Sequence, residues 1–432
     1  MASHWFAFSW IAILIRVMHA ADPSWVSLNV TVATTMTDLD YMYSQVPLLF
    51  GTPQQPMDVT INLSGDLLSA WSDDCIFCQG EESFDKTLSS TIKSNGIVWP
   101  SSQPELNGEY YSDVISFGGV LTAQNMDFVL MEEMSMNFSA RINNGHLGLL
   151  VNNTAPRSQR LLTKLWDDGS LLNPVVGLRL DPIKPRLTIG ALDPEDYSGE
   201  INWVEMETPT ADFTNAIKID GVKGFNGSFL PFGGDLIATL NTFSRNIAVP
   251  PSNPYALDDG YTGPIDLINL YPNGGFSFLC NGTELPYVYL TVTINGVDYQ
   301  VDSQDNMLHK TTMAAAHADA KPDVVLGQPF LRSVYLAYRF PTDNCPGYYG
   351  FAFPSGANRT QDQINQTPTS TPTLSSQCLA LTTPTSTPTA SMMSKSVKSL
   401  LQTGSYEVFG NNGEGQVALT GADNLPKTTR NK

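Results

Sequence analysis

Two asparagine residues stand at loops of the kind that carry catalytic groups. Asn62 ends an apolar strand in VTINLSGDLLSAW, and Asn241 ends another in DLIATLNTFSRNIAVPP. A loop that follows a buried strand in this way is where an enzyme places a carboxylate for general acid–base chemistry. An amide donates and accepts hydrogen bonds but does not act as a base at ordinary pH. The two loops therefore predict hydrogen bonding to a ligand rather than proton transfer.

Both loops belong to an internal repeat. NGHLGLL follows the first loop after about 80 residues, and PDVVLGQPF follows the second loop at the same distance. Strand, loop and an apolar-apolar-Gly segment thus occur twice in the same order. Such a repeat predicts two similar lobes that face each other across a cleft.

The segments that would position these loops are mostly β-type. Between residues 41 and 355, short runs rich in Val, Ile, Thr, Tyr and Phe are separated by Gly, Pro and Asn, as in LTIGAL, INWVEM and SVYLAYRF. Gly51-Thr52-Pro53 predicts a tight turn between two strands. SQRLLTKLWDDG has apolar residues at helical spacing, and GQPFLRSVY is expected to begin a short helix. The fold class is therefore mostly β.

Several segments together resemble the pepsin-like aspartic proteases over residues 41 to 355. The matching segments, in chain order, are GTPQQ, HLGLL, LTIGALDPEDYSGEINWVEM, LPYVYLTVTING, VVLGQPFLRSVYLAYRF and YYGFAFP. The resemblance implies a bilobal β fold, with two homologous β lobes and a cleft between them. It also implies two Asp-Thr-Gly loops, whose carboxylates share one proton and activate a water.

This sequence departs from that pattern at both loops. The aspartate positions are Asn62 and Asn241, so no competent catalytic residue is expected. The loop residues expected to line the cleft are Leu63, Ser64, Thr242, Phe243 and Ser244. Asp66 is an alternative carboxylate, four residues late. The two asparagines could hold a peptide without cutting it, or they could only support their loops.

The flap over the family's cleft carries a tyrosine. The corresponding position falls on VWPSS, near Trp99 or Pro100, and the alternative is an ordinary loop aromatic. The family's basic prosegment also has no counterpart, because residues 21 to 41 contain no Lys or Arg.

The ends of the chain differ in composition from the body. WFAFSWIAILI, followed by MHAADP, predicts a secretory signal, and a membrane anchor is the alternative. A Thr/Ser/Pro-rich segment after Pro354 predicts a disordered, glycosylated stalk. The predicted divisions are a signal peptide (1–21), an N-terminal extension (22–40), an N-terminal lobe (41–200), a C-terminal lobe (201–356), a stalk (357–393) and a disordered tail (394–432).

Cysteines and sequons fit a secreted or cell-surface protein. A redox pair or half a zinc site is the alternative for the C-x-x-C motif, but we expect the disulfides Cys75–Cys78 and Cys280–Cys345, with Cys378 left over. N-x-S/T sequons occur at Asn29, Asn62, Asn137, Asn152, Asn226, Asn281, Asn358 and Asn365.

The bulk properties limit the partners. The net charge of −19 argues against nucleic acid, whose phosphates would repel the protein. No segment after the N-terminus is long and apolar enough to span a membrane. We expect a monomer without metal or cofactor that binds a peptide or protein ligand in the cleft, as a decoy or as an inhibitor of another enzyme. The alternatives are an active aspartic endopeptidase with atypical loops and a structural glycoprotein of the cell surface.

Overall fold

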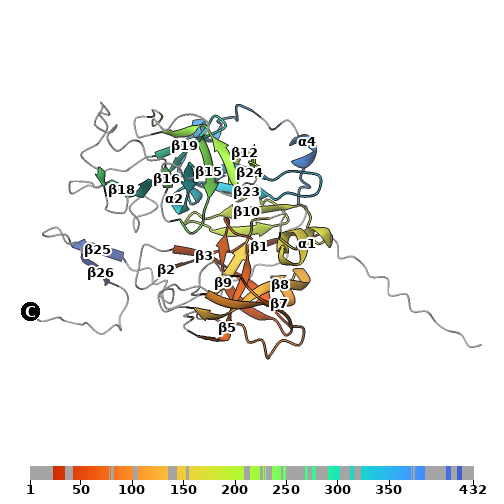
Figure 1. The fold of residues 1–432 in the computed structure, drawn as a ribbon. Helices are drawn as coiled ribbons and strands as arrows, with labels where there is room; N and C mark the ends of the chain where they lie inside the picture. Colours follow the sequence, from red (N-terminus) through yellow and green to blue (C-terminus); the bar gives the residue numbers. More distant parts are fainter. Residues whose placement is uncertain are drawn as a thin grey trace, which may run out of the picture.

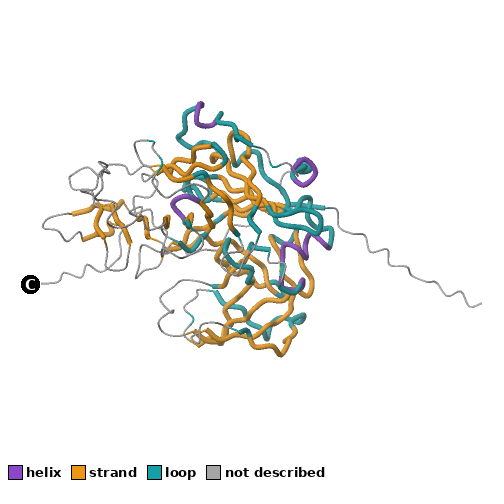
Figure 2. Tube along the Cα trace, turned by 45° about the horizontal axis from the view of Figure 1, so that its top comes forward, coloured by secondary structure: helices purple, strands orange, loops and turns teal. Residues whose placement is uncertain are grey.

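The protein is built mainly from strands, as the computed structural model shows (Figure 2). The structure describes residues 23–34, 42–76, 78, 82–100, 106–134, 144–151, 155–208, 215–223, 227, 229, 236–244, 247–249, 268–270, 275–278, 290–301, 312–315, 323–370, 372, 375–384, 405–409 and 416–420. The predicted signal peptide, residues 1–21, lies outside these ranges.

The first lobe is an eight-stranded sheet in the order β2-β3-β4-β9-β5-β8-β7-β6. It occupies the lower half of Figure 1. The predicted turn at Gly51-Thr52-Pro53 joins its strands β3 and β4. The strands are β2 (Thr31–Thr34), β3 (Met42–Phe50), β4 (Gln55–Asn62), β5 (Leu68–Ile76), β6 (Lys93–Val98), β7 (Leu106–Phe117), β8 (Leu121–Met134) and β9 (Gly145–Gly148).

The second lobe contains a seven-stranded sheet in the order β13-β15-β22-β16-β21-β18-β17 and a three-stranded sheet in the order β14-β19-β20. Strands of this lobe lie in the upper half of Figure 1. The strands are β13 (Ala216–Ile219), β14 (Gly221–Lys223), β15 (Leu236–Leu240), β16 (Ile247–Val249), β17 (Ile268–Leu270), β18 (Gly275–Phe278), β19 (Leu290–Ile294), β20 (Val297–Val301), β21 (Thr312–Ala315) and β22 (Val324–Leu326).

A six-stranded antiparallel sheet, with strands from both halves of the chain, lies between the lobes (Figure 1). Every residue of its strands β23 and β24 is buried, because neighbouring layers cover both faces of the sheet. Its strands, in sheet order, are β1 (Val26–Asn29), β11 (Arg186–Ile189), β10 (Val175–Arg179), β23 (Tyr335–Arg339), β24 (Tyr348–Pro354) and β12 (Tyr197–Glu205). The mostly β, two-lobed architecture predicted from the sequence is confirmed.

Helices are short in the described part of the chain. Both predicted helices are confirmed, in SQRLLTKLWDDG as α1 and in GQPFLRSVY as α2. The helical segments are η1 (Arg157–Gln159), α1 (Leu161–Asp167), α2 (Gln328–Leu331), α3 (Gln361–Ile364) and α4 (Ser375–Cys378). In α1 the buried residues are Leu161, Leu162 and Leu165, which is the apolar stripe that the spacing predicts.

The predicted N-terminal extension, 22–40, is wrong as a separate segment. Strand β1 pairs with β11 in the central sheet, and Val26 and Leu28 are fully buried there. Strand β2 pairs with β3 at the edge of the first lobe. WVSLNVTV alternates apolar and polar residues, so the chain before residue 41 supplies strands to the body.

The predicted stalk, 357–393, also differs from the structure over its described part. Thr369 donates its backbone N–H to the carbonyl of Asn295 at 2.9 Å, and Thr382 donates to Oδ1 of Asn173 at 2.7 Å. Leu381 packs on the cluster that includes Tyr335. Hydrogen bonds from its backbone hold this segment against the body. The Thr/Ser/Pro composition of the segment did not indicate these contacts.

Two paired strands also replace the predicted disorder in part of the tail, 394–432. Strands β25 (Ser405–Phe409) and β26 (Gln416–Thr420) pair antiparallel. SYEVF and QVALT are both β-type runs, which explains the pairing.

The disulfides are partly as predicted. Cys75 bonds to Cys78 as predicted, so neither sulfur is free to serve as a ligand of a zinc half-site in this structure. Cys345 bonds to Cys378, so the predicted Cys280–Cys345 bridge is wrong, because a sulfur atom forms only one such bond. Cys280 lies outside the described residues.

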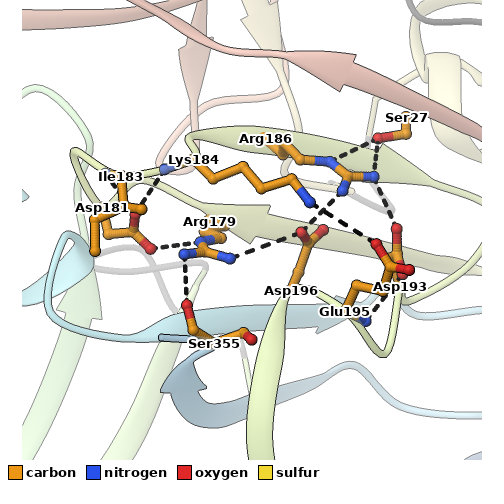
Figure 3. A network of polar contacts seen from close by, with 10 residues as sticks. All are labelled: Ser27, Arg179, Asp181, Ile183, Lys184, Arg186, Asp193, Glu195, Asp196 and Ser355. Atoms are coloured by element: carbon orange, nitrogen blue, oxygen red, sulfur yellow. Dashed lines mark hydrogen bonds and ion pairs between the residues drawn. The ribbon is translucent and has the colours of Figure 1, made fainter. Parts of the chain in front are cut away.

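A buried ionic network in the central sheet links its strand β1 to the residue that follows its strand β24 (Figure 3). Arg186 pairs with Asp196 at 3.1 Å and donates to the hydroxyl of Ser27 on β1 at 2.9 Å. Arg179, 4.0 Å from Asp196, donates to the carbonyl of Ser355 just after β24 at 2.7 Å. The two guanidinium groups thus join the first strand and the last strand of the body to one carboxylate.

We predict that Cys378→Ser lowers the free energy of unfolding by about 3–4 kcal/mol, because a bridge across 33 residues restricts the unfolded chain. Cys345→Ser should give the same loss, and Cys280→Ser should give little or none. Chemical denaturation of the three variants measures this. A large loss in Cys280→Ser alone would contradict the observed pairing.

Candidate functional site

The two asparagine loops occupy equivalent places in their lobes. Strand β9 lies between β4 and β5, so it brackets the loop of Asn62, and β22 lies in the same way between β15 and β16 around Asn241. Both inserted strands run parallel to the strand that leads into the asparagine loop, β9 to β4 and β22 to β15. The predicted internal repeat is therefore confirmed as a structural repeat.

Gly148 shows why the apolar-apolar-Gly segment is needed. A Cβ atom at this position would lie 2.4 Å from the backbone carbon of Asp66. The two segments are joined by hydrogen bonds. The N–H of Gly148 donates to the carbonyl of Leu67, and the N–H of Leu150 donates to the carbonyl of Gly65. Because Gly148 has no side chain, strand β9 can pack directly against the backbone of the loop.

Each asparagine uses its side-chain oxygen inside its own loop. Oδ1 of Asn62 accepts the N–H of Ser64 at 3.0 Å and also its hydroxyl. Oδ1 of Asn241 accepts the N–H of Phe243 at 2.8 Å. This Asx-turn geometry assigns the oxygen and nitrogen of both amides. The remaining group of each side chain is therefore an NH₂ donor.

Hydrogen bonds between the lobes join the two loops. The hydroxyl of Thr242 donates to the carbonyl of Ile61 at 2.8 Å and accepts the N–H of Leu63 at 3.3 Å. Leu63 is the counterpart of Thr242 in the first loop. It is buried and has no hydroxyl that could form the matching hydrogen bond to the second loop. Instead Asn215 donates from Nδ2 to the carbonyls of Leu63 and Leu240, at 3.1 and 2.9 Å.

Helix α2 supports the second loop. Gln328 donates its backbone N–H to the carbonyl of Ser244 and its side-chain amide to the carbonyl of Thr242, both at 2.8 Å. Gln328 and Asn215 are site residues that the sequence interpretation missed. Gln328 follows the glycine of the second repeat segment, so its position was a usable signal. No sequence pattern marked Asn215.

Phe243 contacts the first lobe, although it belongs to the second. Its ring lies 5.4 Å from the ring of His146 on β9 and 6.2 Å from that of Tyr43 on β3. Burial lowers the pKa of His146 to about 4, so the imidazole is neutral at neutral and mildly acidic pH. A glycine at position 243 would leave this space unfilled.

Trp99 lies beside the β6–β7 hairpin of the first lobe, where the flap was predicted. Its N–H donates to the carbonyl of Gly108 at 2.9 Å. The half-buried indole packs with the cluster of Trp71, Val129 and Met131, and Pro100 is exposed. Trp99 is therefore anchored on the lobe, and its role as a flap residue stays a prediction.

The sequons are distributed over both halves of the chain. Asn358 and Asn365 are exposed, while Asn29 and Asn62 are half-buried. Four others, Asn137, Asn152, Asn226 and Asn281, lie outside the described residues. In the part of the chain that the structure describes, no helix has the length and apolar character needed to cross a membrane.

Fold and paired loops together define a two-lobed protein of the pepsin-like type. The family profile described as eukaryotic aspartyl protease matches residues 43–345, and the chain belongs to this family. It is similar to Syncephapepsin of Syncephalastrum racemosum, with 23% identity over 329 residues, which cover 71% of this chain and 78% of that protein. It is also similar to Cathepsin E-B of Xenopus laevis, with 27% identity over 310 residues, 67% of this chain and 74% of that protein.

We predict that Thr242→Val lowers the free energy of unfolding by about 1–3 kcal/mol, because it leaves the buried N–H of Leu63 and carbonyl of Ile61 unpaired. Thr239→Val on β15 is the matched control, since among the described residues the Thr242 hydroxyl, and not that of Thr239, forms hydrogen bonds between the lobes. Thermal unfolding of both variants decides the matter. Equal melting temperatures would show that the hydroxyl does not hold the lobes together.

His146 should make the protein less stable in acid. Its pKa of about 4 in the folded state lies below the ordinary 6.5, so the unfolded chain binds the proton more readily. The stabilising contribution is complete above about pH 6.5 and is lost as the pH falls toward 4. Unfolding of the wild type and His146→Gln across this range should show a steeper loss for the wild type. Parallel curves would contradict the pKa assignment.

Proposed function

We propose that the protein is a secreted, non-hydrolytic member of the aspartyl protease family that binds a peptide or protein segment between its lobes. One observation carries the proposal. The side-chain oxygens of Asn62 and Asn241 both accept a backbone N–H of their own loop, so the groups left for a ligand are amide NH₂ donors.

Such a site has the wrong polarity for hydrolysis. Activation of a water needs one group that takes its proton and another that donates to the scissile carbonyl. An amide NH₂ has no basic lone pair for the first task. It is suited to the carbonyl oxygens of a peptide backbone, which are acceptors.

The loops are also well fixed for binding. Thr242 and Asn215 join the loops by hydrogen bonds between the lobes. Gln328 donates a hydrogen bond to the backbone of the second loop. A preorganised site loses less conformational entropy when it binds, which favours affinity. This supports a retained binding role over the alternative that the asparagines only complete their loops.

A location outside the cell fits the disulfide bonds of the protein. Two disulfides are typical of an oxidising compartment, and the apolar N-terminal run fits a secretory signal. We propose a monomer that is secreted or displayed at the cell surface, with sugars on some of the exposed sequons. A decoy or an inhibitor of another enzyme are the roles such a protein would serve.

A proteolysis assay between pH 3 and 6 tests the proposal. The wild type should cleave unstructured peptides at least about 100-fold more slowly than an aspartyl protease of this family, because general acid–base catalysis contributes about 10²–10⁴-fold. Mass spectrometry of the incubated peptides detects any product.

Variants and an inhibitor separate the alternatives. Asn62→Asp combined with Asn241→Asp restores the carboxylates, so any acid-dependent cleavage should appear in this variant and not in the wild type. Cleavage by the wild type that a statine-type inhibitor blocks would overturn the proposal. Wild-type cleavage that Asp66→Asn abolishes would assign hydrolysis to the alternative carboxylate.

A further inference from the structure

A pocket of about 220 Å³ opens in the first lobe next to the loop of Asn62. Asp66 and Leu67 enter it from the end of that loop, Trp99 from the position after β6, Tyr110 from β7 and Asp127 from β8. Ligand sites for drug-sized molecules measure about 300–1,000 Å³. This pocket is therefore of a size for one side chain of a larger ligand.

Two carboxylates in the pocket wall lack a cationic partner. In the part of the chain that the structure describes, no lysine or arginine forms an ion pair with Asp66 or Asp127. Lys86 of the same lobe is paired elsewhere, with Glu132 at 2.7 Å. Asp127 accepts hydrogen bonds only from the neutral groups of Asn95 and Ser112 among the described residues. The pocket therefore has an excess of negative charge.

The electrostatic effect of these carboxylates is visible on their neighbour. Burial raises the pKa of the Tyr110 hydroxyl, and the charges of Asp66 and Asp127 raise it further. The phenol stays neutral, so its ring and that of Trp99 present aromatic surfaces beside two carboxylates. Aromatic faces with nearby negative charge are the environment that attracts alkylammonium and guanidinium groups.

We propose that this pocket binds the side chain of a lysine or arginine residue of the ligand, with its charge against Asp66 and Asp127 and its methylene groups on Trp99 and Tyr110. The inference rests on the proposed function, because it specifies which peptides the protein retains. It selects basic segments, and the excess of acidic over basic residues in the chain as a whole, 42 against 23, favours the same partners.

Small probes test the pocket independently of the rest of the site. N-acetyl-lysine methylamide and its norleucine analogue differ by one charged group and are titrated into the full chain at low salt, with binding followed by ligand-observed NMR. We expect millimolar affinity for the lysine probe, as its size allows, and binding about tenfold weaker for the norleucine probe.

Asp66→Asn should remove most of this preference, and Asp343→Asn, an exposed carboxylate outside the pocket, should preserve it. Asp127→Asn should have the same effect as Asp66→Asn, with thermal unfolding as a check because Asp127 also accepts two hydrogen bonds. Equal affinity for both probes, or a preference that survives Asp66→Asn, would overturn the inference.

Longer peptides separate the two proposals. Ten-residue peptides that contain a central lysine, norleucine or glutamate should bind in that order of affinity, and all should remain uncleaved. If the lysine probe binds through Asp66 but no peptide binds, the proposed function fails and the pocket assignment stands. If peptides bind without regard to the central residue, the proposed function stands and the pocket assignment fails.

Discussion

The hydrogen bonds that Thr242 and Asn215 form between the lobes are the contacts on which the rest of the site depends. They set the two asparagine loops against each other across the lobes. The resemblance to Asp-Thr-Gly loops implies a threonine on both sides. Leu63 replaces one of them, and the donor that reaches Leu240 comes from Asn215, on a different segment.

This arrangement keeps the geometry of a catalytic loop pair and changes its chemistry. The Asx turns fix both amide oxygens inward, so the exchange of a carboxylate for an amide replaces acceptors by donors. Phe243 adds an apolar group that packs on His146 and Tyr43 of the other lobe. We propose that the family's framework remains and that both loops have lost its water-activating groups.

The sequence predicted the parts of this structure that depend on local pattern. Alternating β-type runs, the repeat of loop and apolar-apolar-Gly, and the Cys75–Cys78 bridge are all visible within a few residues. It failed where distant segments meet. The Cys345–Cys378 bridge depends on the Thr/Pro-rich segment lying against the body, and the role of Asn215 depends on two carbonyls far away in sequence. Composition describes the solubility of such a segment, but not the backbone contacts that hold it.

We propose that the two loops bind a peptide through amide donors. The affinity of one uncleaved peptide for the wild type and for Asn62→Asp combined with Asn241→Asp, measured by calorimetry at pH 7, tests this most directly. At that pH an aspartate pair carries negative charge that repels peptide carbonyls. We predict that the variant binds at least about tenfold more weakly, since each lost donor contributes about 1 kcal/mol. Equal or tighter binding by the variant would contradict this binding mode.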